Sequence, residues 1–383
     1  MNALGAVVDL GDKTLTLKNY EQTMTIPLEF YTPQRQTSNS LGMPQYSHQQ
    51  NFNDKKDPQQ FSSITESSVF RTSHLSELEK KQLLRLLKEN NSAFHKPESK
   101  LTCSTVVECA INTTDDIPVH QKVYPYPAAY TDEVNKQIDK LLRDGIIRPS
   151  RSAWTSPVWI VPKKQDASGE KKFRMVIDYR KINEKTISDR YPMPEISYVL
   201  DQLKGQNFFS TLDLASGFHQ IKMKESDIEK TAFSINNGKY EFTRMPFGLK
   251  NAPAIFQRAI DDVLRQFIGK ICYVIVFGKT LDEALQNLDV VLKALNNANL
   301  KIQLDKSEFL HKELEFSGYI ISSEGIKPNL KKIETIQNYP EPKTIKELRS
   351  FLGMMSYYRR FVKDFAKIAK PLTNLLRGEK NDS

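Results

Sequence analysis

The run Phe209–Phe218 places a single carboxylate, that of Asp213, between Leu212 and Leu214. An apolar run of this length that ends at a Ser-Gly pair is typical of a buried strand. A carboxylate in such surroundings is costly unless it is paired, hydrogen-bonded or bound to a cation. For an isolated acid the simplest partner is a lysine or a backbone N–H, so the neighbouring sequence has to decide whether a metal ion is involved.

The composition excludes several classes of protein. A chain of 383 residues is long enough for two or three domains, and 39% hydrophobic and 26% charged residues are ordinary for a soluble protein. No apolar run approaches the roughly 18 residues that span a bilayer, and the N-terminus does not resemble a signal peptide. The spacing of the three cysteines favours neither disulfides nor zinc. We therefore expect an intracellular protein, cytoplasmic or nuclear, without a membrane partner.

The net charge of +9 is unevenly distributed along the chain. Residues 326–378 hold twelve Lys or Arg against four Asp or Glu, so this segment alone carries +8. Positive charge concentrated in one part of a chain indicates a polyanionic partner, most often a nucleic acid.

Periodicity divides the chain into regions. Residues 1–30 alternate apolar and polar side chains as in β-hairpins, and residues 31–70 have the polar composition of a disordered linker. Residues 71–120 form a connector with one helix, over 73–90, and one strand, over 105–111. Ser76 and Glu79 have capping-box spacing at the start of that helix.

Strands alternate irregularly with helices from residue 121 onward, which predicts an α+β fold with a sheet packed on helices. Past residue 326 the segment is helical, and Thr344 with Glu347 again has capping-box spacing. The predicted elements of the middle region are helices over 130–144, 194–203, 253–267 and 281–297 and strands over 158–162, 172–178, 271–277, 300–304 and 315–321.

Several motifs together resemble the reverse transcriptases of gypsy-type LTR retrotransposons. The motifs are Gly145-Ile-Ile-Arg-Pro-Ser150, Phe173-Arg-Met-Val-Ile-Asp-Tyr-Arg180, Tyr191-Pro-Met-Pro194, the Asp213 run, Met245-Pro-Phe-Gly-Leu-Lys-Asn-Ala-Pro253, Glu347-Leu-Arg-Ser-Phe-Leu-Gly353 and Tyr357-Tyr-Arg-Arg-Phe361. The resemblance covers about residues 70–378. It implies a right-hand polymerase fold with fingers and a ferredoxin-like palm over 121–325, a basic helical thumb over 326–378 and a tail over 379–383. Residues 1–30 resemble the last strands of the element's aspartic protease, although no Asp-Thr-Gly or Asp-Ser-Gly occurs in the chain.

The resemblance also implies a reaction and the residues that serve it. A primer 3′-hydroxyl attacks the α-phosphate of a deoxynucleoside triphosphate, with two Mg²⁺ ions holding the attacking and leaving oxygens. Asp213 would be a catalytic residue and a metal ligand. Lys163 or Lys164 and Arg174 would bind the triphosphate, and Phe218 would exclude a 2′-hydroxyl by its bulk. The residues expected to contact an RNA template, an RNA–DNA hybrid or a DNA duplex are Arg180, Lys250, Arg359, Arg360, Lys363 and Lys367.

One departure from this family decides the activity that we expect. Its members carry two further acids in a Tyr-x-Asp-Asp turn, within a stretch similar to Cys-Tyr-Val-Tyr-Ile-Asp-Asp-Ile-Ile-Val-Phe. This chain has Cys272-Tyr-Val-Ile-Val-Phe277, about five residues shorter, and no Asp or Glu occurs between Asp262 and Asp282. The acids Asp261, Asp262, Asp282 and Glu283 are expected to be solvated helix residues. His219 stands where relatives have a bulky aromatic residue, and we interpret it as a packing substitution.

These observations predict a reverse transcriptase-like domain that is a catalytically inactive copy. Two alternatives stay open. In the first, the gap is an error in the coding sequence, and the genuine protein is an active RNA-directed DNA polymerase. In the second, the chain is a non-catalytic nucleic-acid-binding protein.

Overall fold

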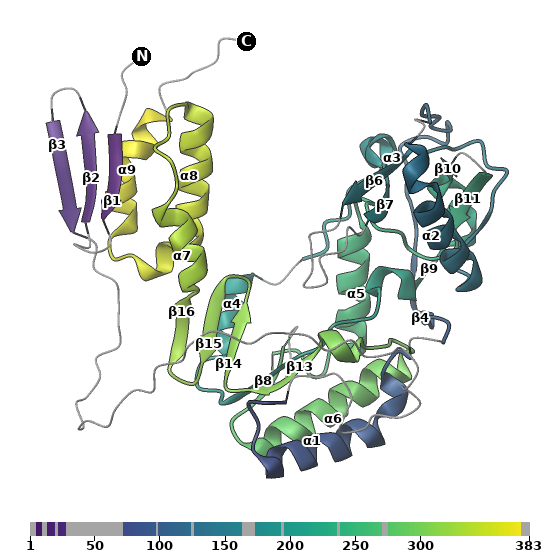
Figure 1. Ribbon diagram of the computed structural model, residues 1–383, viewed down its shortest axis with the longest axis horizontal. Coiled ribbons are helices and arrows are strands. Elements are labelled where there is room, and N and C mark those ends of the chain that lie inside the picture. Colours follow the sequence, from purple (N-terminus) through teal and green to yellow (C-terminus); the bar gives the residue numbers. More distant parts are fainter. Residues whose placement is uncertain are drawn as a thin grey trace. The chain divides into compact units, whose positions relative to one another are not determined.

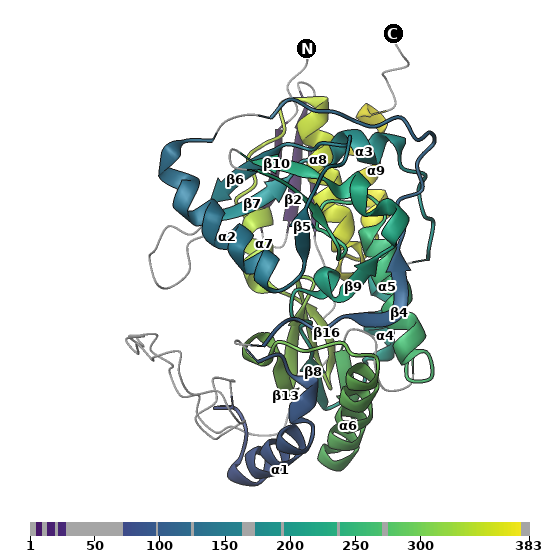
Figure 2. The same ribbon diagram turned by 90° about the vertical axis from the view of Figure 1, so that its right-hand side faces the viewer.

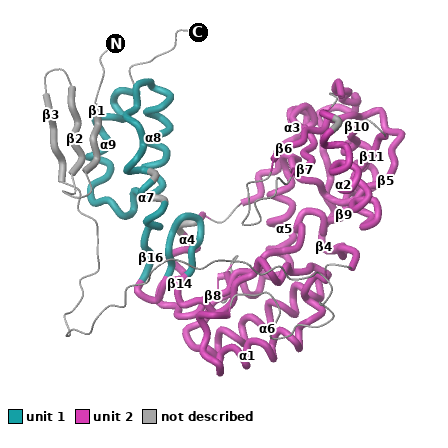
Figure 3. The backbone as a smooth tube through the Cα atoms, viewed as in Figure 1, with its two compact units in different colours: residues 1–56, 314–321, 325–383 teal, residues 57–313, 322–324 magenta. Residues whose placement is uncertain are grey.

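A computed structural model describes residues 5–9, 14–19, 22–27, 72–96, 99–123, 126–162, 173–192, 195–235, 238–269 and 275–376, the first three ranges by backbone alone. Two compact units are present. Unit 1 comprises residues 1–56, 314–321 and 325–383, and unit 2 comprises residues 57–313 and 322–324 (Figure 3). None of the described helices combines the length and the apolarity needed to cross a membrane. The predicted linker over 31–70 and the tail over 379–383 lie outside the described residues.

The part of unit 2 that carries the Asp213 run is a three-stranded antiparallel sheet on helices (Figure 1). Its strand order is β12-β8-β13, with β8 over Phe208–Thr211, β12 over Ile275–Gly278 and β13 over Glu308–His311. Helices α1 (Glu77–Glu89) and α6 (Leu281–Asn297) lie side by side in both views of the molecule (Figures 1 and 2) and share one apolar core with β12 and β13. Residues 270–274, which precede β12, lie outside the described part of the chain.

The remainder of unit 2 contains a second core, formed between residues 101 and 259. Its secondary-structure elements include a parallel pair of strands, β4 and β9, and an antiparallel hairpin of β6 and β7. The strands are β4 (Ser104–Cys109), β5 (Ile147–Pro149), β6 (Val158–Pro162), β7 (Phe173–Ile177), β9 (Ile221–Met223), β10 (Phe233–Ile235) and β11 (Gly238–Phe242), and the helices are α2 (Thr131–Arg143), α3 (Arg180–Lys185), α4 (Ile196–Gln202) and α5 (Ala252–Leu264).

Unit 1 contains a helical segment and two three-stranded sheets. The Ser-Gly pair at residues 317–318 has positive φ angles, and it turns the predicted single strand over 315–321 into the hairpin β14–β15. The elements are β1 (Gly5–Asp9), β2 (Thr14–Asn19), β3 (Gln22–Pro27), β14 (Glu313–Phe316), β15 (Tyr319–Ser322), β16 (Gly325–Pro328), α7 (Leu330–Gln337), α8 (Ile345–Tyr357) and α9 (Phe365–Leu375).

Local sequence signals account for several of the described helix ends. The two predicted capping boxes are both present, Ser76 with Glu79 on α1 and Thr344 with Glu347 on α8. Gly145 follows α2 with a φ of +66°, the left-handed conformation that a glycine adopts readily after a helix. The strand predicted over 300–304 is absent, because Ile302 makes only isolated bridges, to Phe94 and Leu214.

Candidate functional site

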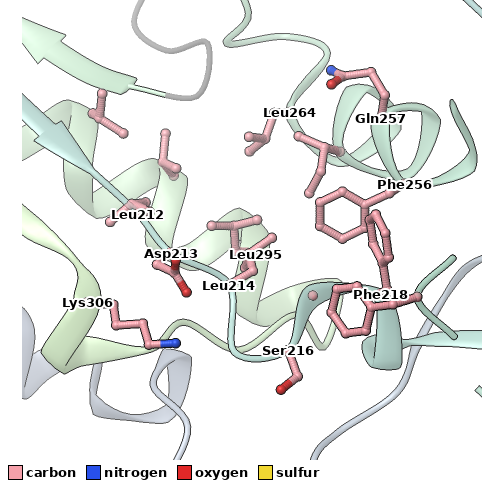
Figure 4. Close-up of a pocket in the computed structure, with 15 residues that line it drawn as sticks. Leu212, Asp213, Leu214, Ser216, Phe218, Phe256, Gln257, Leu264, Leu295 and Lys306 are labelled. Carbon is pink, nitrogen blue, oxygen red and sulfur yellow. The ribbon is translucent and has the colours of Figure 1, made fainter. Parts of the chain in front are cut away.

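Asp213 lies two residues beyond the end of β8 and not inside a strand as the sequence predicted. Its backbone is fixed on both sides, since its N–H donates to Ser307 Oγ at 3.1 Å and its carbonyl accepts from the Gln303 N–H at 2.7 Å. The Ser307 hydroxyl in turn donates to the Gln303 carbonyl at 2.9 Å. The Asp213 side chain is exposed and borders a cavity (Figure 4). The predicted buried strand therefore ends at Thr211, and Asp213 lies in an anchored loop that presents its carboxylate to solvent.

A buried glutamine fixes the chain that follows Asp213. The Gln220 side chain is fully buried, and its Nε2 donates to the carbonyls of Ala215 and Lys301, at 2.8 Å each. Its Oε1 accepts from the Lys301 N–H at 2.6 Å. Two of these hydrogen bonds join the chain after β8 to Lys301 in the segment before β13, and the third holds the loop itself, a role that no local pattern in the sequence indicated.

The charges around Asp213 are few. Partial burial raises the pKa of Asp213, a neighbouring Asp305 raises it further, and Lys306 lowers it. Among the described residues no group of three His, Cys, Asp or Glu side chains is arranged to hold a metal ion. Mg²⁺ prefers several hard oxygen ligands in near-octahedral geometry, so the described residues do not fit a two-magnesium centre.

Three of the four acids that flank the gap form contacts of their own. Asp261 accepts hydrogen bonds from the Tyr191 hydroxyl and from Gln257 Nε2, at 2.8 Å each. Asp262 forms an ion pair with Arg265. Glu283 accepts from the Lys279 N–H at 2.9 Å at the start of α6. These contacts agree with the interpretation of the acids as helix-surface groups.

Phe218 lies in an aromatic cluster on the opposite side of the cavity from Lys306 (Figure 4). Its ring centroid is 5.0 Å from that of Phe247 and 5.3 Å from that of Phe256. A side chain on Gly217 would meet the Phe256 ring at 2.9 Å, so the glycine lets the short helical turn that carries Phe218 approach α5. The structure therefore brings Asp213 and Phe218 to the same cavity.

The basic residues singled out in unit 2 are dispersed. Arg174 is exposed on β7 and is not among the side chains that line the cavity. The Arg180 guanidinium pairs with the buried Asp178 carboxylate at 2.7 Å while staying largely exposed. The Lys250 ammonium donates to the Thr186 carbonyl at 2.8 Å, which is a structural contact. Lys163 and Lys164 lie outside the described residues.

In unit 1 the basic side chains follow α8. Arg359 and Arg360 lie in a short 3-10 helix, and the Arg360 guanidinium stands 6.0 Å from the centroid of the Phe361 ring. Lys363 comes two residues later, and Lys367 forms an exposed ion pair with Asp364 at 3.1 Å. This segment thus presents cationic side chains at a helix junction.

His219 is held in its neutral form by its surroundings. Burial lowers the pKa of His219 to about 4, against its ordinary 6.5. The ring lies nearly parallel to that of Phe242 with centroids 5.9 Å apart, and one ring nitrogen is 3.2 Å from the Met245 carbonyl. These contacts favour the packing role that the sequence predicted.

This burial predicts a loss of stability in acid. Below pH 6.5 the unfolded chain protonates this histidine while the folded chain does not, so stability falls between pH 6.5 and about 4. At about 1.4 kcal/mol per pH unit, the loss between pH 6.5 and pH 4.5 is on the order of 3 kcal/mol. His219→Phe should remove that part of the slope. Denaturant unfolding of both proteins at pH 7.5 and 4.5 measures it, and equal slopes would refute the assignment.

Known proteins of one family are similar to this chain in sequence. The family described as "Reverse transcriptase (RNA-dependent DNA polymerase)" matches residues 161–321. The chain is 55% identical over 298 residues to the retrovirus-related Pol polyprotein from transposon opus of Drosophila melanogaster, covering 76% of this chain and 30% of the relative. It is 49% identical over 306 residues to the corresponding polyprotein from transposon gypsy of the same species, covering 78% and 30%. The chain therefore spans about a third of the length of these relatives.

Solved structures give the same result for the fold. A foamy viral protease-reverse transcriptase in complex with double-stranded DNA matches with a TM-score of 0.71 and 30% identity, over 80% of this chain and 54% of the other. A foamy viral protease-reverse transcriptase bound to an RNA/DNA hybrid matches with a TM-score of 0.68 over 99% of this chain and 51% of the other. At 24% identity the second match concerns the fold alone.

Proposed function

Because this chain carries a reverse transcriptase-like domain of the retrotransposon Pol polyprotein family, we propose that it binds primed templates without extending them. The observation that carries this proposal is the isolation of Asp213. No acid occurs between Asp262 and Asp282, and Asp261, Asp262 and Glu283 on either side of that gap have other partners.

Polymerisation in this family depends on divalent metal ions and deoxynucleoside triphosphates. In a polymerase, two metal ions stabilise the attacking and the leaving oxygen together. One exposed carboxylate next to Lys306 offers a metal ion a single protein ligand and a nearby positive charge that repels it. We expect Mg²⁺ to bind weakly here, and Phe218 with Arg174, Lys163 and Lys164 to retain at most a contact with a nucleotide.

Binding of nucleic acid does not require the lost acids. Contacts with phosphates depend on positive charge and place a protein on a duplex regardless of base sequence. The candidates with exposed cationic groups are Arg180 in unit 2 and Arg359, Arg360 and Lys367 in unit 1. The foamy viral relatives were solved with double-stranded DNA and with an RNA/DNA hybrid, and we propose the same classes of partner for this chain.

A salt titration tests this proposal. Changing Arg359 and Arg360 to glutamine should weaken binding of an RNA–DNA hybrid about tenfold or more at low salt. It should also reduce the slope of log K against log salt by about 2, since each phosphate contact contributes about 0.9. Fluorescence anisotropy of a labelled hybrid at several salt concentrations measures both quantities.

The matched control changes Lys81 and Lys88 to glutamine, which removes the same charge from the exposed face of α1. That variant should bind almost as well as the unmodified protein. An equal loss of affinity in both variants would show that the protein's net charge alone causes the effect. An unchanged affinity in the arginine variant would contradict the proposal that the thumb segment contacts nucleic acid.

A further inference from the structure

A cavity of about 510 Å³ lies beside Asp213 (Figure 4). It is bounded by the loop after β8, by one face of α5, by β12 and by the second half of α6. Ten of its lining residues have apolar side chains, and Leu264, Val276, Val291 and Leu295 also belong to the core shared with α1. Strand β12 pairs with β8, and Val276 of β12 lines the cavity.

The charged groups of this cavity lie at one end, while the Gln257 amide lies beside Phe256 and donates to Asp261 (Figure 4). Asp213 and Lys306 lie together, with the Ser216 hydroxyl pointing away nearby, while Phe218 and Phe256 face them from the other end (Figure 4). Within the described chain no side chain donates a hydrogen bond to the Asp213 carboxylate, and Lys306 acts on it through its charge alone. The cavity thus has an aromatic end and an acidic end.

We propose that this cavity binds a small aromatic amine, with its ring packed against the Phe218 and Phe256 pair and its cationic group on the Asp213 carboxylate. Ligand pockets in proteins have volumes of about 300 to 1,000 Å³ and apolar walls with a few placed polar groups, and this cavity has both properties. The ring supplies apolar and edge-to-face contacts with the two phenylalanines. The ammonium group supplies the hydrogen-bond donor that the carboxylate lacks. The proposal is independent of the thumb contacts with nucleic acid, because it involves no residue of the thumb segment.

Two probes of equal shape test the acidic end. The probes are 2-naphthylmethylamine, which is cationic at neutral pH, and 2-naphthylmethanol, which is neutral. Titration calorimetry of the full chain, without nucleic acid or metal, should show the amine binding at least fivefold more tightly than the alcohol. Asp213→Asn should bring this ratio close to one. Lys306→Gln should raise it, because that change removes the competing charge. If the ratio of amine affinity to alcohol affinity is the same in both variants as in the unmodified protein, the proposed orientation of the ligand is wrong.

Two filling variants test the location. Ile260→Phe on α5 and Leu214→Phe in the loop each place a larger side chain against the cavity. Each should reduce the affinity for both probes about tenfold, while thermal unfolding shows that the variant is folded. The failure of both probes to bind the unmodified protein, or undiminished binding to both folded variants, would refute the site. Neither result bears on the salt titration of the thumb arginines, so the two proposals fail separately.

Discussion

A primed RNA template should be extended at least a thousandfold more slowly by this protein than by a variant carrying Tyr-Ile-Asp-Asp-Ile inserted between Val274 and Ile275. The insertion restores the stretch that the gypsy-type family resemblance implies, and with it two acids. Each factor of ten in rate corresponds to about 1.4 kcal/mol of transition-state stabilisation. Two-metal clamping contributes several kcal/mol, so a difference of about 4 kcal/mol, or a thousandfold, is a conservative expectation. Incorporation of a labelled deoxynucleotide in the presence of Mg²⁺ measures it.

The control for this experiment is Asp213→Asn placed in the variant with the insertion. That double change should return incorporation to the level of the unmodified chain, because Asp213 would then be one of three required acids. Incorporation by the unmodified chain that clearly exceeds its own Asp213→Asn background would contradict the proposal of inactivity. Sequencing the transcript across codons 270–280 shows whether the five residues are absent from the gene product itself.

Gly278→Ala should destabilise unit 2 by about 2 to 4 kcal/mol, the upper range for overpacking a core. A Cβ at this position would lie 2.6 Å from the Ala284 nitrogen and 2.8 Å from its Cα. Both atoms belong to the backbone of α6, so no rotamer relieves the clash. The start of the helix is held by Thr280, whose side chain accepts from the Glu283 N–H, and by Asn287, which donates to the Phe277 carbonyl. The helix must therefore shift away from β12.

Tryptophan fluorescence during urea unfolding reports this change, because both tryptophans of the chain, Trp154 and Trp159, belong to unit 2. Gly353→Ala is the matched control, since nothing lies within 4 Å of a Cβ there and the position is inside α8. It makes the same chemical change in unit 1 and should leave the tryptophan transition in place. If Gly278→Ala, like the control Gly353→Ala, leaves the midpoint of the tryptophan transition unchanged, then α6 and β12 are packed less closely than the structure shows.

The sequence predicted the elements whose ends carry their own signals. Helix α6 has the predicted bounds, Leu281–Asn297, because a threonine cap and an apolar stripe are both local features. The capping boxes of α1 and α8 were predicted for the same reason. Strands β6 and β7 were likewise predicted, from two short apolar runs.

Features that depend on distant partners were not predictable in this way. Apolar neighbours made Asp213 look like a strand residue, whereas Ser307 and Gln303 hold it in a loop from about 90 positions away. The structural contact of Lys250 with Thr186 and the role of Gln220 likewise depend on pairing across the fold. A sequence pattern encodes the apolar character of a position but not the polar partner that it meets.

The pairing between the α1 segment and the chain before β13 sets an order of events during folding. The Ile302 N–H donates to the Ala93 carbonyl, and Lys301 Nζ reaches the Ser92 carbonyl across 209 positions of sequence. The core between residues 101 and 259 is closed within that interval, so it can form while the ribosome is still synthesising α6. The apolar face of helix α1 stays exposed until α6 and the chain before β13 have been synthesised. Contacts between residues so far apart in sequence also form slowly. We therefore expect early chaperone contact to concentrate on residues 77–94.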